Sequence, residues 1–184
     1  MKLNRHEITA IGIFSGLAVA GGYLFIAVPN VEIFTAIIFL SGFLLGPRNG
    51  MLVGIVAQTF YSILNPFGSS PAPLLIAQVL NRAIVAHVGG KFGKFLNMNK
   101  MSWTKSLYLG AAGLLLTWLY DLMAYLSFFF LSGFSVQQMK TTFALGLLFY
   151  LIHGVVNTAI FALVLPFIIR RLTRMDILNT ANLS

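Results

Sequence analysis

Long apolar segments separated by short polar turns make up most of this chain. The first, fifth and last segments reach the roughly 20 residues that a helix needs to cross hydrocarbon. Helices are expected, since a chain in lipid must satisfy its backbone hydrogen bonds internally. The pattern predicts an all-α integral membrane protein, a six-helix transmembrane bundle forming one domain over residues 1–184. The expected helices are 8–28, 33–46, 50–64, 72–95, 106–131 and 141–170.

The second and third segments are the shortest, and turn-forming residues surround them. The sequence Gly-Pro-Arg-Asn-Gly at 46–50 joins them, Val-Pro-Asn-Val-Glu at 28–32 precedes them, and Asn-Pro-Phe-Gly at 65–68 follows. Pro presets φ, while Gly and Asn tolerate positive φ, so these places favour turns. Apolar runs this short are often re-entrant or buried. A hairpin is predicted, and whether both of its arms cross the membrane stays open.

Composition excludes a soluble domain. The chain is 58% hydrophobic and 9% charged, against roughly 25% charged residues in soluble domains. The net charge of +8 does not indicate a nucleic-acid partner, because the basic residues gather in every second connection and at both ends. The positive-inside rule then predicts that the N and C termini are both cytoplasmic. The basic residues that carry this prediction are Lys2, Arg5, Arg48, Lys91, Lys94, Lys100, Lys105, Arg170, Arg171 and Arg174.

The first segment has two further features. Lys2 and Arg5 precede an apolar run ending in Ala18-Val19-Ala20, which is also the pattern of a cleaved signal peptide. We favour a retained membrane helix, because the chain that follows is apolar almost throughout. Small residues recur every four positions in this segment, a spacing that allows another helix to approach closely, either within the bundle or from a partner. They are Gly12, Gly16 and Ala20.

Polar side chains inside apolar helices are costly and are often functional. Arg82 lies ten residues inside its segment, about 15 Å deep at 1.5 Å per residue. It therefore needs a partner; Asp121, at a similar depth, is the best placed, and Glu32 could serve only if its loop folds inward. Whether the pair is structural or contacts a ligand stays open, and His153 is more often a hydrogen-bonded core residue than a ligand contact. Polar or aromatic residues sharing helix faces are Gln58, Tyr61 or Ser62, and Asn65; Gln78 and Arg82, with Asn81 beside them; Trp118, Asp121 and Tyr125; and Tyr150, His153 and Asn157.

Known catalytic patterns are missing from the sequence. It contains no cysteine, no paired histidines, no Gly-x-Ser-x-Gly elbow and no phosphate-binding Gly-x-x-x-x-Gly-Lys-Ser/Thr loop. We therefore expect no enzyme, no cofactor and no bound metal, with any ATP hydrolysis carried out by partner subunits. A self-sufficient oligomeric permease or channel is the alternative within transport. A membrane-embedded enzyme is the alternative from another class.

The hairpin sequence, the length, the basic ends and the small-residue stripe together resemble the substrate-binding S components of energy-coupling factor (ECF) vitamin transporters. The most distinctive run is Val-Pro-Asn-Val-Glu at 28–32, followed by Phe-Leu-Ser-Gly-Phe-Leu-Leu-Gly-Pro-Arg-Asn-Gly at 39–50 and Asn-Pro-Phe-Gly at 65–68, similar to cobalamin-related or uncharacterised members. The resemblance implies a multi-pass protein of a prokaryotic plasma membrane. It also implies that the chain captures a vitamin or related micronutrient from outside, with cobalamin or a precursor among the candidates.

The resemblance further implies partners and site residues. S components dock on a membrane coupling subunit, the T component, which joins two cytoplasmic ATPase subunits. Their docking motif is Ala-x-x-x-Ala on the first helix, and Gly12 and Gly16 occupy the matching positions here, with Ala20 one step further. Ligand contacts in the family come from the outer loops and the outer halves of the later helices. In this chain those places hold Asn30, Glu32, Tyr61, Asn65, Gln78, Arg82, Trp118, Asp121, Tyr125, His153 and Asn157.

Overall fold

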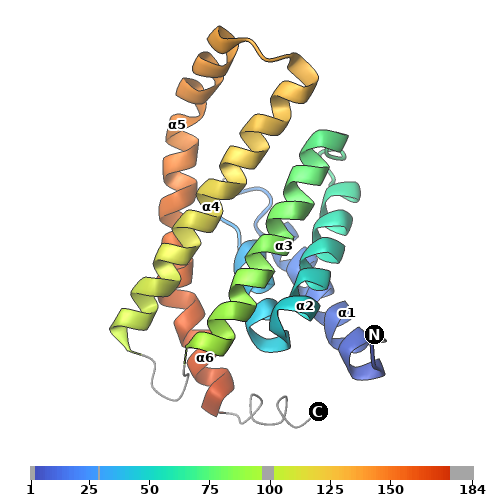
Figure 1. Cartoon of the computed structure of the whole chain (residues 1–184), viewed down its shortest axis with the longest axis vertical. Coiled ribbons are helices and arrows are strands. Elements are labelled where there is room, and N and C mark those ends of the chain that lie inside the picture. Colours follow the sequence, from blue (N-terminus) through green and yellow to red (C-terminus); the bar gives the residue numbers. More distant parts are fainter. Residues whose placement is uncertain (1–2, 29, 97–101, 175–184) are drawn as a thin grey trace.

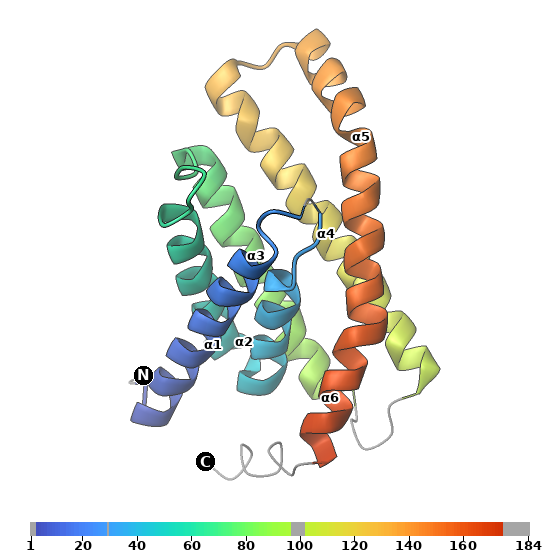
Figure 2. The same ribbon diagram turned by 180° about the vertical axis from the view of Figure 1, so that it is seen from behind.

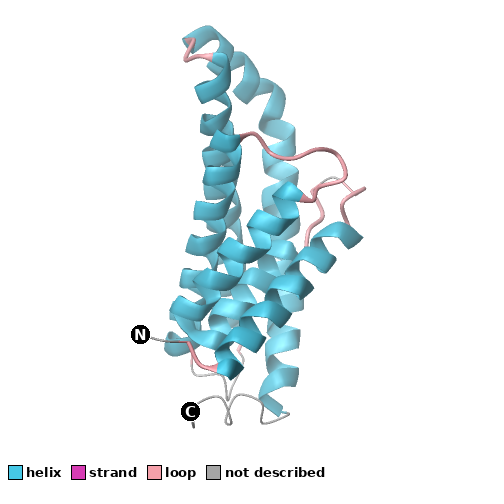
Figure 3. Cartoon of the chain, turned by 90° about the vertical axis from the view of Figure 1, so that its right-hand side faces the viewer, coloured by secondary structure: helices cyan, strands magenta, loops and turns pink. Residues whose placement is uncertain are grey.

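All regular structure in the described part of the chain is helical. The computed structural model describes residues 3–28, 30–96 and 102–174 (Figures 1 and 3). The prediction of an all-helical chain is thus confirmed. The elements are α1 (Arg5–Leu24), α2 (Phe34–Ile63), α3 (Ala72–Phe95), α4 (Trp103–Ser132), α5 (Val136–Ala159), a π-helical turn η1 (Ile160–Val164) and α6 (Leu165–Arg174).

Five described stretches are long and apolar enough to cross a membrane. They are α1, α2, α3, α4 and the continuous run Val136–Leu172, which joins α5 to α6 through η1. The predicted segments 33–46 and 50–64 both fall within α2. The count of six helices and the cytoplasmic placement of the termini therefore remain predictions.

The helical run of α2 is interrupted at Gly46, whose φ of 82° and ψ of 166° are not helical. A Cβ atom built on Gly50 would overlap the Cα atom of Gly42. Residues eight apart in a straight helix lie about 12 Å from each other, so the chain folds back on itself here (Figure 2). Pro47 cannot donate a backbone hydrogen bond and follows the break directly. The α2 arms on either side of Gly46 are each shorter than α4.

Glycines allow α2 and α3 to pack backbone against backbone. A Cβ atom on Gly42 would overlap the carbonyl oxygen of Ala86, and one on Gly89 would overlap the carbonyl oxygen of Phe39. Close approach of this kind is the usual role of small residues between membrane helices. Helix α1 joins the same group, with Ala18 fully buried. Asn4 caps its first turn in a reciprocal pair with Glu7.

Helices α4 and α5 form a hairpin that extends beyond the other helices at the Gly133 end (Figures 1 and 2). The opposite end holds the start of α1, the break in α2, the end of α3 and the end of α6. These element ends carry Arg5, Arg48, Lys91, Lys94, Arg170 and Arg171. We call this the basic end of the molecule.

The glycine packing gives a direct test. Gly42→Ala should destabilise the protein by about 1–3 kcal/mol, because the new methyl group meets backbone that cannot move aside. Gly12→Ala is the matched control: no atom lies within 4 Å of its added Cβ. The control should be neutral or slightly stabilising. Thermal unfolding of both purified variants in mild detergent measures the difference, and equal midpoints would contradict the packing described.

Candidate functional site

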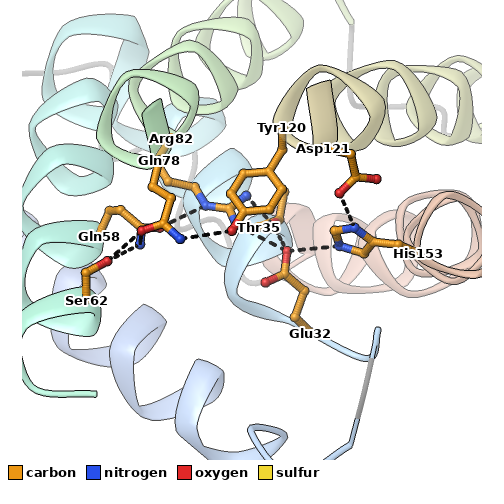
Figure 4. A network of polar contacts seen from close by, with 9 residues as sticks. All are labelled: Glu32, Thr35, Gln58, Ser62, Gln78, Arg82, Tyr120, Asp121 and His153. Atoms are coloured by element: carbon orange, nitrogen blue, oxygen red, sulfur yellow. Dashed lines mark hydrogen bonds and ion pairs between the residues drawn. The ribbon is translucent and has the colours of Figure 1, made fainter. Parts of the chain in front are cut away.

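Arg82 of α3 is the centre of a buried polar network (Figure 4). Only 3% of the residue is exposed. Its Nε donates to Gln58 Oε1 at 3.1 Å, one terminal nitrogen donates to Thr35 Oγ1 at 2.6 Å, and the other contacts Glu32 Oε1 at 3.4 Å. The ring of Tyr120 lies 4.4 Å from the guanidinium carbon. All three nitrogens of Arg82 are therefore engaged by the protein itself.

Glu32 comes from the loop between α1 and α2, which folds inward over the bundle. Its carboxylate contacts Arg82, accepts a hydrogen bond from Thr35, and lies 3.7 Å from His153 Nε2. Burial alone would raise the pKa of Glu32, but the charge of Arg82 and the contacts with His153 and Thr35 outweigh it and lower the pKa to about 2. The carboxylate is thus held ionised and ties the loop to both α3 and α5.

A second pair joins α4 to α5. Asp121 Oδ1 lies 2.9 Å from His153 Nδ1, and both residues are at most 6% exposed. Each ring nitrogen of His153 therefore faces a carboxylate, Asp121 on one side and Glu32 on the other. The second oxygen of Asp121, Oδ2, is buried and has no hydrogen-bond partner. It remains able to accept a hydrogen bond.

Amide and hydroxyl groups continue the network toward the turn between α2 and α3. Gln58 Nε2 donates to Ser62 Oγ at 2.8 Å, and Ser62 donates to Gln78 Oε1 at 2.9 Å. Gln78 in turn donates to the Tyr120 hydroxyl at 3.2 Å. This chain of bonds links the second arm of α2 with α3 and α4, and the Arg82–Thr35 bond adds the first arm, so the network fixes their relative positions.

An aromatic-walled cavity of about 320 Å³ lies between α4 and α5. Asp121 is the one charged residue among those that line it, so the cavity adjoins the network at this carboxylate. A larger cavity of about 550 Å³, between α1, the first arm of α2 and the η1–α6 region, is lined by apolar side chains alone. Small-molecule sites combine apolar walls with a few placed polar groups, which favours the α4–α5 cavity. Its lining residues are Trp118, Asp121, Leu122, Tyr125, Phe143, Leu147, Tyr150 and Leu151.

The structure brings most of the predicted site residues together. The network contains Glu32, Gln58, Gln78, Arg82, Asp121 and His153, while the cavity wall contains Trp118 and Tyr125. One expectation was wrong: the acidic partner of Arg82 among the described residues is Glu32, since the loop does fold inward, and Asp121 pairs with His153 instead.

Four predicted residues lie apart from these contacts. Tyr61 stacks on Tyr23 of α1 with ring centroids 5.0 Å apart. Asn65 accepts the backbone N–H of Phe67 at 2.9 Å and shapes the outer turn. Asn30 has a φ of 62° and a buried Oδ1 without a partner, and Asn157 is fully buried with neither side-chain atom paired.

Sequence reasoning missed several members of the site. Thr35 follows Glu32 by three residues. This spacing would have indicated a contact only if the start of the helix after the loop had been known. Tyr120 adjoins Asp121, but it points toward α3 and so lies off the face that Trp118, Asp121 and Tyr125 share. Ser62 was considered only as an alternative to Tyr61. Tyr150 was indicated by the helix face that it shares with His153 and Asn157 but not as a ligand contact, and Phe143 was part of an aromatic background with no feature in the sequence to distinguish it.

The small-residue stripe of α1 faces away from the bundle. Gly12, Gly16 and Ala20 are exposed, and a Cβ atom on either glycine would meet nothing within 4 Å. Within the described residues, the stripe therefore does not pack inside its own bundle.

The fold and site together define a multi-pass membrane protein with an internal polar network beside an aromatic cavity. A family model described as ECF-type riboflavin transporter, S component, matches residues 2–174. The chain belongs to this family of substrate-binding transporter subunits, which are not enzymes. Searches of curated proteins and of solved structures found no match.

The Arg82–Glu32 pair can be tested by a double-mutant cycle. Arg82→Met should destabilise the protein by about 3–5 kcal/mol, because Glu32 loses its countercharge in a buried position. Adding Glu32→Gln should recover much of this loss, since the carboxylate that faced Arg82 is then replaced by a neutral amide. Denaturant unfolding in mixed micelles measures the coupling. Additive effects of the two substitutions would show that the pair does not interact.

The low pKa of Glu32 predicts acid sensitivity. A carboxylate whose folded pKa of about 2 lies below its ordinary value of 4.5 contributes stability above pH 4.5. That contribution is lost as the pH falls from 4.5 through 2. The unfolding midpoint of Glu32→Gln should therefore change less than that of the wild type between pH 6 and pH 3. Parallel curves for the two proteins would contradict the assignment.

Proposed function

We propose that this chain is the subunit of an ECF importer that captures a vitamin-like solute outside the cell. Family membership supports the class of protein, and the α4–α5 cavity supports the place of binding. The cavity lies in the half of α4 and α5 nearer to Gly133, away from the basic end. Under the positive-inside rule the basic end is cytoplasmic, so the cavity is on the outer side of a prokaryotic plasma membrane.

The single observation that carries the proposal is the combination of aromatic walls with one free carboxylate oxygen. Trp118, Tyr125, Phe143 and Tyr150 line the cavity with rings against which a flat ligand can pack, and Asp121, also in its wall, has a carboxylate oxygen, Oδ2, without a partner in the protein. A cavity of about 320 Å³ is at the lower end of the range for small-molecule sites. It suits a flat molecule of the size of a flavin.

We therefore take riboflavin, named in the family's description, as the first candidate substrate. A corrinoid such as cobalamin is several times larger than a flavin and would require α4 and α5 to separate. All three nitrogens of Arg82 are engaged by its own network, so this arrangement leaves none free for an anionic group of the ligand.

The partners are a membrane coupling subunit and two cytoplasmic ATPase subunits. The exposed α1 stripe is the proposed docking surface, because Gly12 and Gly16 leave open space where another helix can approach closely. The coupling subunit would supply that helix, and the ATPases would supply the energy that this chain has no motif to provide.

Riboflavin binding tests the proposal. Stacking against Trp118 and Tyr150 should quench flavin fluorescence when purified wild-type protein is titrated in mild detergent. Trp118→Ala and Tyr150→Ala should each weaken binding about tenfold, since ring contacts and buried area are lost together. Trp103→Ala is the matched control, because this exposed tryptophan at the start of α4 does not line the cavity.

Two other results of the riboflavin titration would change the proposal. Unchanged affinity in both cavity variants would place the ligand elsewhere. If riboflavin does not bind, a thermal-shift panel of thiamine, biotin, cobalamin and purine-like bases, with native mass spectrometry for a retained ligand, decides between another vitamin and none. A protein that binds no member of the panel and retains no small molecule would contradict the proposed function.

A further inference from the structure

Unpartnered polar atoms gather in the bundle interior on the basic-end side of the Asp121–His153 pair. Asn81 of α3, Thr117 of α4 and Asn157 of α5 are each at most 1% exposed. Both side-chain atoms of each asparagine, the Thr117 hydroxyl and Asp121 Oδ2 have no hydrogen-bond partner. Buried polar groups are normally paired, so four such residues on three neighbouring helices require an explanation.

The contacts between α4 and α5 place Thr117 opposite Asn157. Asp121 bonds to His153 on one side of this level, and Gly113 packs against the ring of Phe161 on the other. Thr117 lies four residues from both Asp121 and Gly113. Asn157 likewise lies four residues from both His153 and Phe161. Since residues four apart share a helix face, Thr117 and Asn157 meet one turn below the Asp121–His153 bond.

Helix α3 brings the backbone of Asn81 to the level of Tyr120, because Gln78 donates to the Tyr120 hydroxyl and Arg82 lies against the Tyr120 ring. The region where Thr117 and Asn157 meet is closed on both sides. The Asp121–His153 pair separates it from the Glu32 loop, and the fully buried rings of Phe39 and Phe161, with centroids 5.1 Å apart, close the basic-end side.

The net charge of the region around Thr117 and Asn157 depends on its ionisable neighbours. Among the described residues of the network, Glu32 and Asp121 are acidic and Arg82 is the one permanent cation. With His153 protonated, which a carboxylate at each of its ring nitrogens favours, these charges cancel; with His153 neutral, the interior carries one excess negative charge. Buried charge of that kind is strongly unfavourable unless it is compensated. The unpartnered Asp121 Oδ2 is where a compensating positive charge would be most favourable.

We propose that Asn81, Thr117, Asp121 and Asn157 form a binding site for a small hard monovalent cation, with sodium as its probe. Two amide oxygens, one hydroxyl and one carboxylate oxygen are the ligand type that hard cations take. The ion accepts the lone pairs that the protein leaves unused, and it restores neutrality when His153 is neutral. The site is separate from the vitamin cavity, sharing only Asp121 with it, and does not depend on the proposed function.

The test uses the full chain, purified in mild detergent in N-methyl-D-glucamine buffer without sodium. Sodium added at constant ionic strength should raise the thermal midpoint, and ²²Na⁺ should be retained in a scintillation proximity assay. Thr117→Val and Asn157→Leu should each weaken ²²Na⁺ binding at least tenfold. Thr158→Val is the matched control, because the Thr158 hydroxyl donates to Gly154 of its own helix at 2.7 Å and is not part of the site.

Folding of the variants is checked in the same buffer. Thr117→Val removes an unpartnered buried hydroxyl at nearly constant shape, so without sodium it should be at least as stable as the wild type. Loss of stability in Thr117→Val and Asn157→Leu without sodium would show that these groups hold structural water, and would overturn the proposal. Equal ²²Na⁺ retention in the wild type and both variants would overturn it as well.

Two further results would overturn the proposal. The first is that no ²²Na⁺ is retained and that the thermal midpoint is the same in sodium and in N-methyl-D-glucamine. The second is a thermal midpoint that does not change with sodium and falls as the pH rises through neutrality. In that case the compensating charge is a proton on His153, the group that faces Asp121, Glu32 and the ring of Tyr120.

Discussion

A guanidinium inside a helical membrane protein must be neutralised and have its donors bonded, and Arg82 imposes this requirement on the rest of the molecule. Its three nitrogens contact Glu32 from the loop after α1, Thr35 from the first arm of α2 and Gln58 from the second arm. Because charge is costly in a medium of low dielectric, the α1–α2 loop is held over the bundle. Glu32 then reaches His153 and connects this half of the protein to α4 and α5.

The protein consists of two regions with different packing. Helices α1, α2 and α3 approach so closely that glycine backbones touch neighbouring carbonyls at Gly42 and Gly89. Helices α4 and α5 are separated by an aromatic cavity over part of their length. A tightly packed region that carries the polar network beside a looser pair of helices is a suitable arrangement for ligand binding, since the pair can adjust while the network remains fixed.

Buried polar groups without partners occur in two neighbouring places of this protein. Asp121 Oδ2 adjoins the cavity, and Asn81, Thr117 and Asn157 occupy the closed level beneath it. Sequences that fold well usually satisfy every buried polar group, and exceptions concentrate at functional sites. His153 has a carboxylate at each of its ring nitrogens and lies beside both places.

The sequence by itself determined that the chain is helical and lies in a membrane, because hydrophobic run length and backbone hydrogen bonding leave few alternatives. It also indicated the polar positions, since residues such as Arg82, Asp121 and His153 are costly in apolar helices wherever they point. Only the tertiary structure decided the pairing. Arg82 meets Glu32 rather than Asp121 because the loop folds inward, and sequence spacing carries no information on that fold. The outward direction of Gly12 and Gly16, the roles of Thr35 and Tyr120, and the convergence of Asn81, Thr117 and Asn157 likewise depend on how the helices pack, which periodicity alone does not specify.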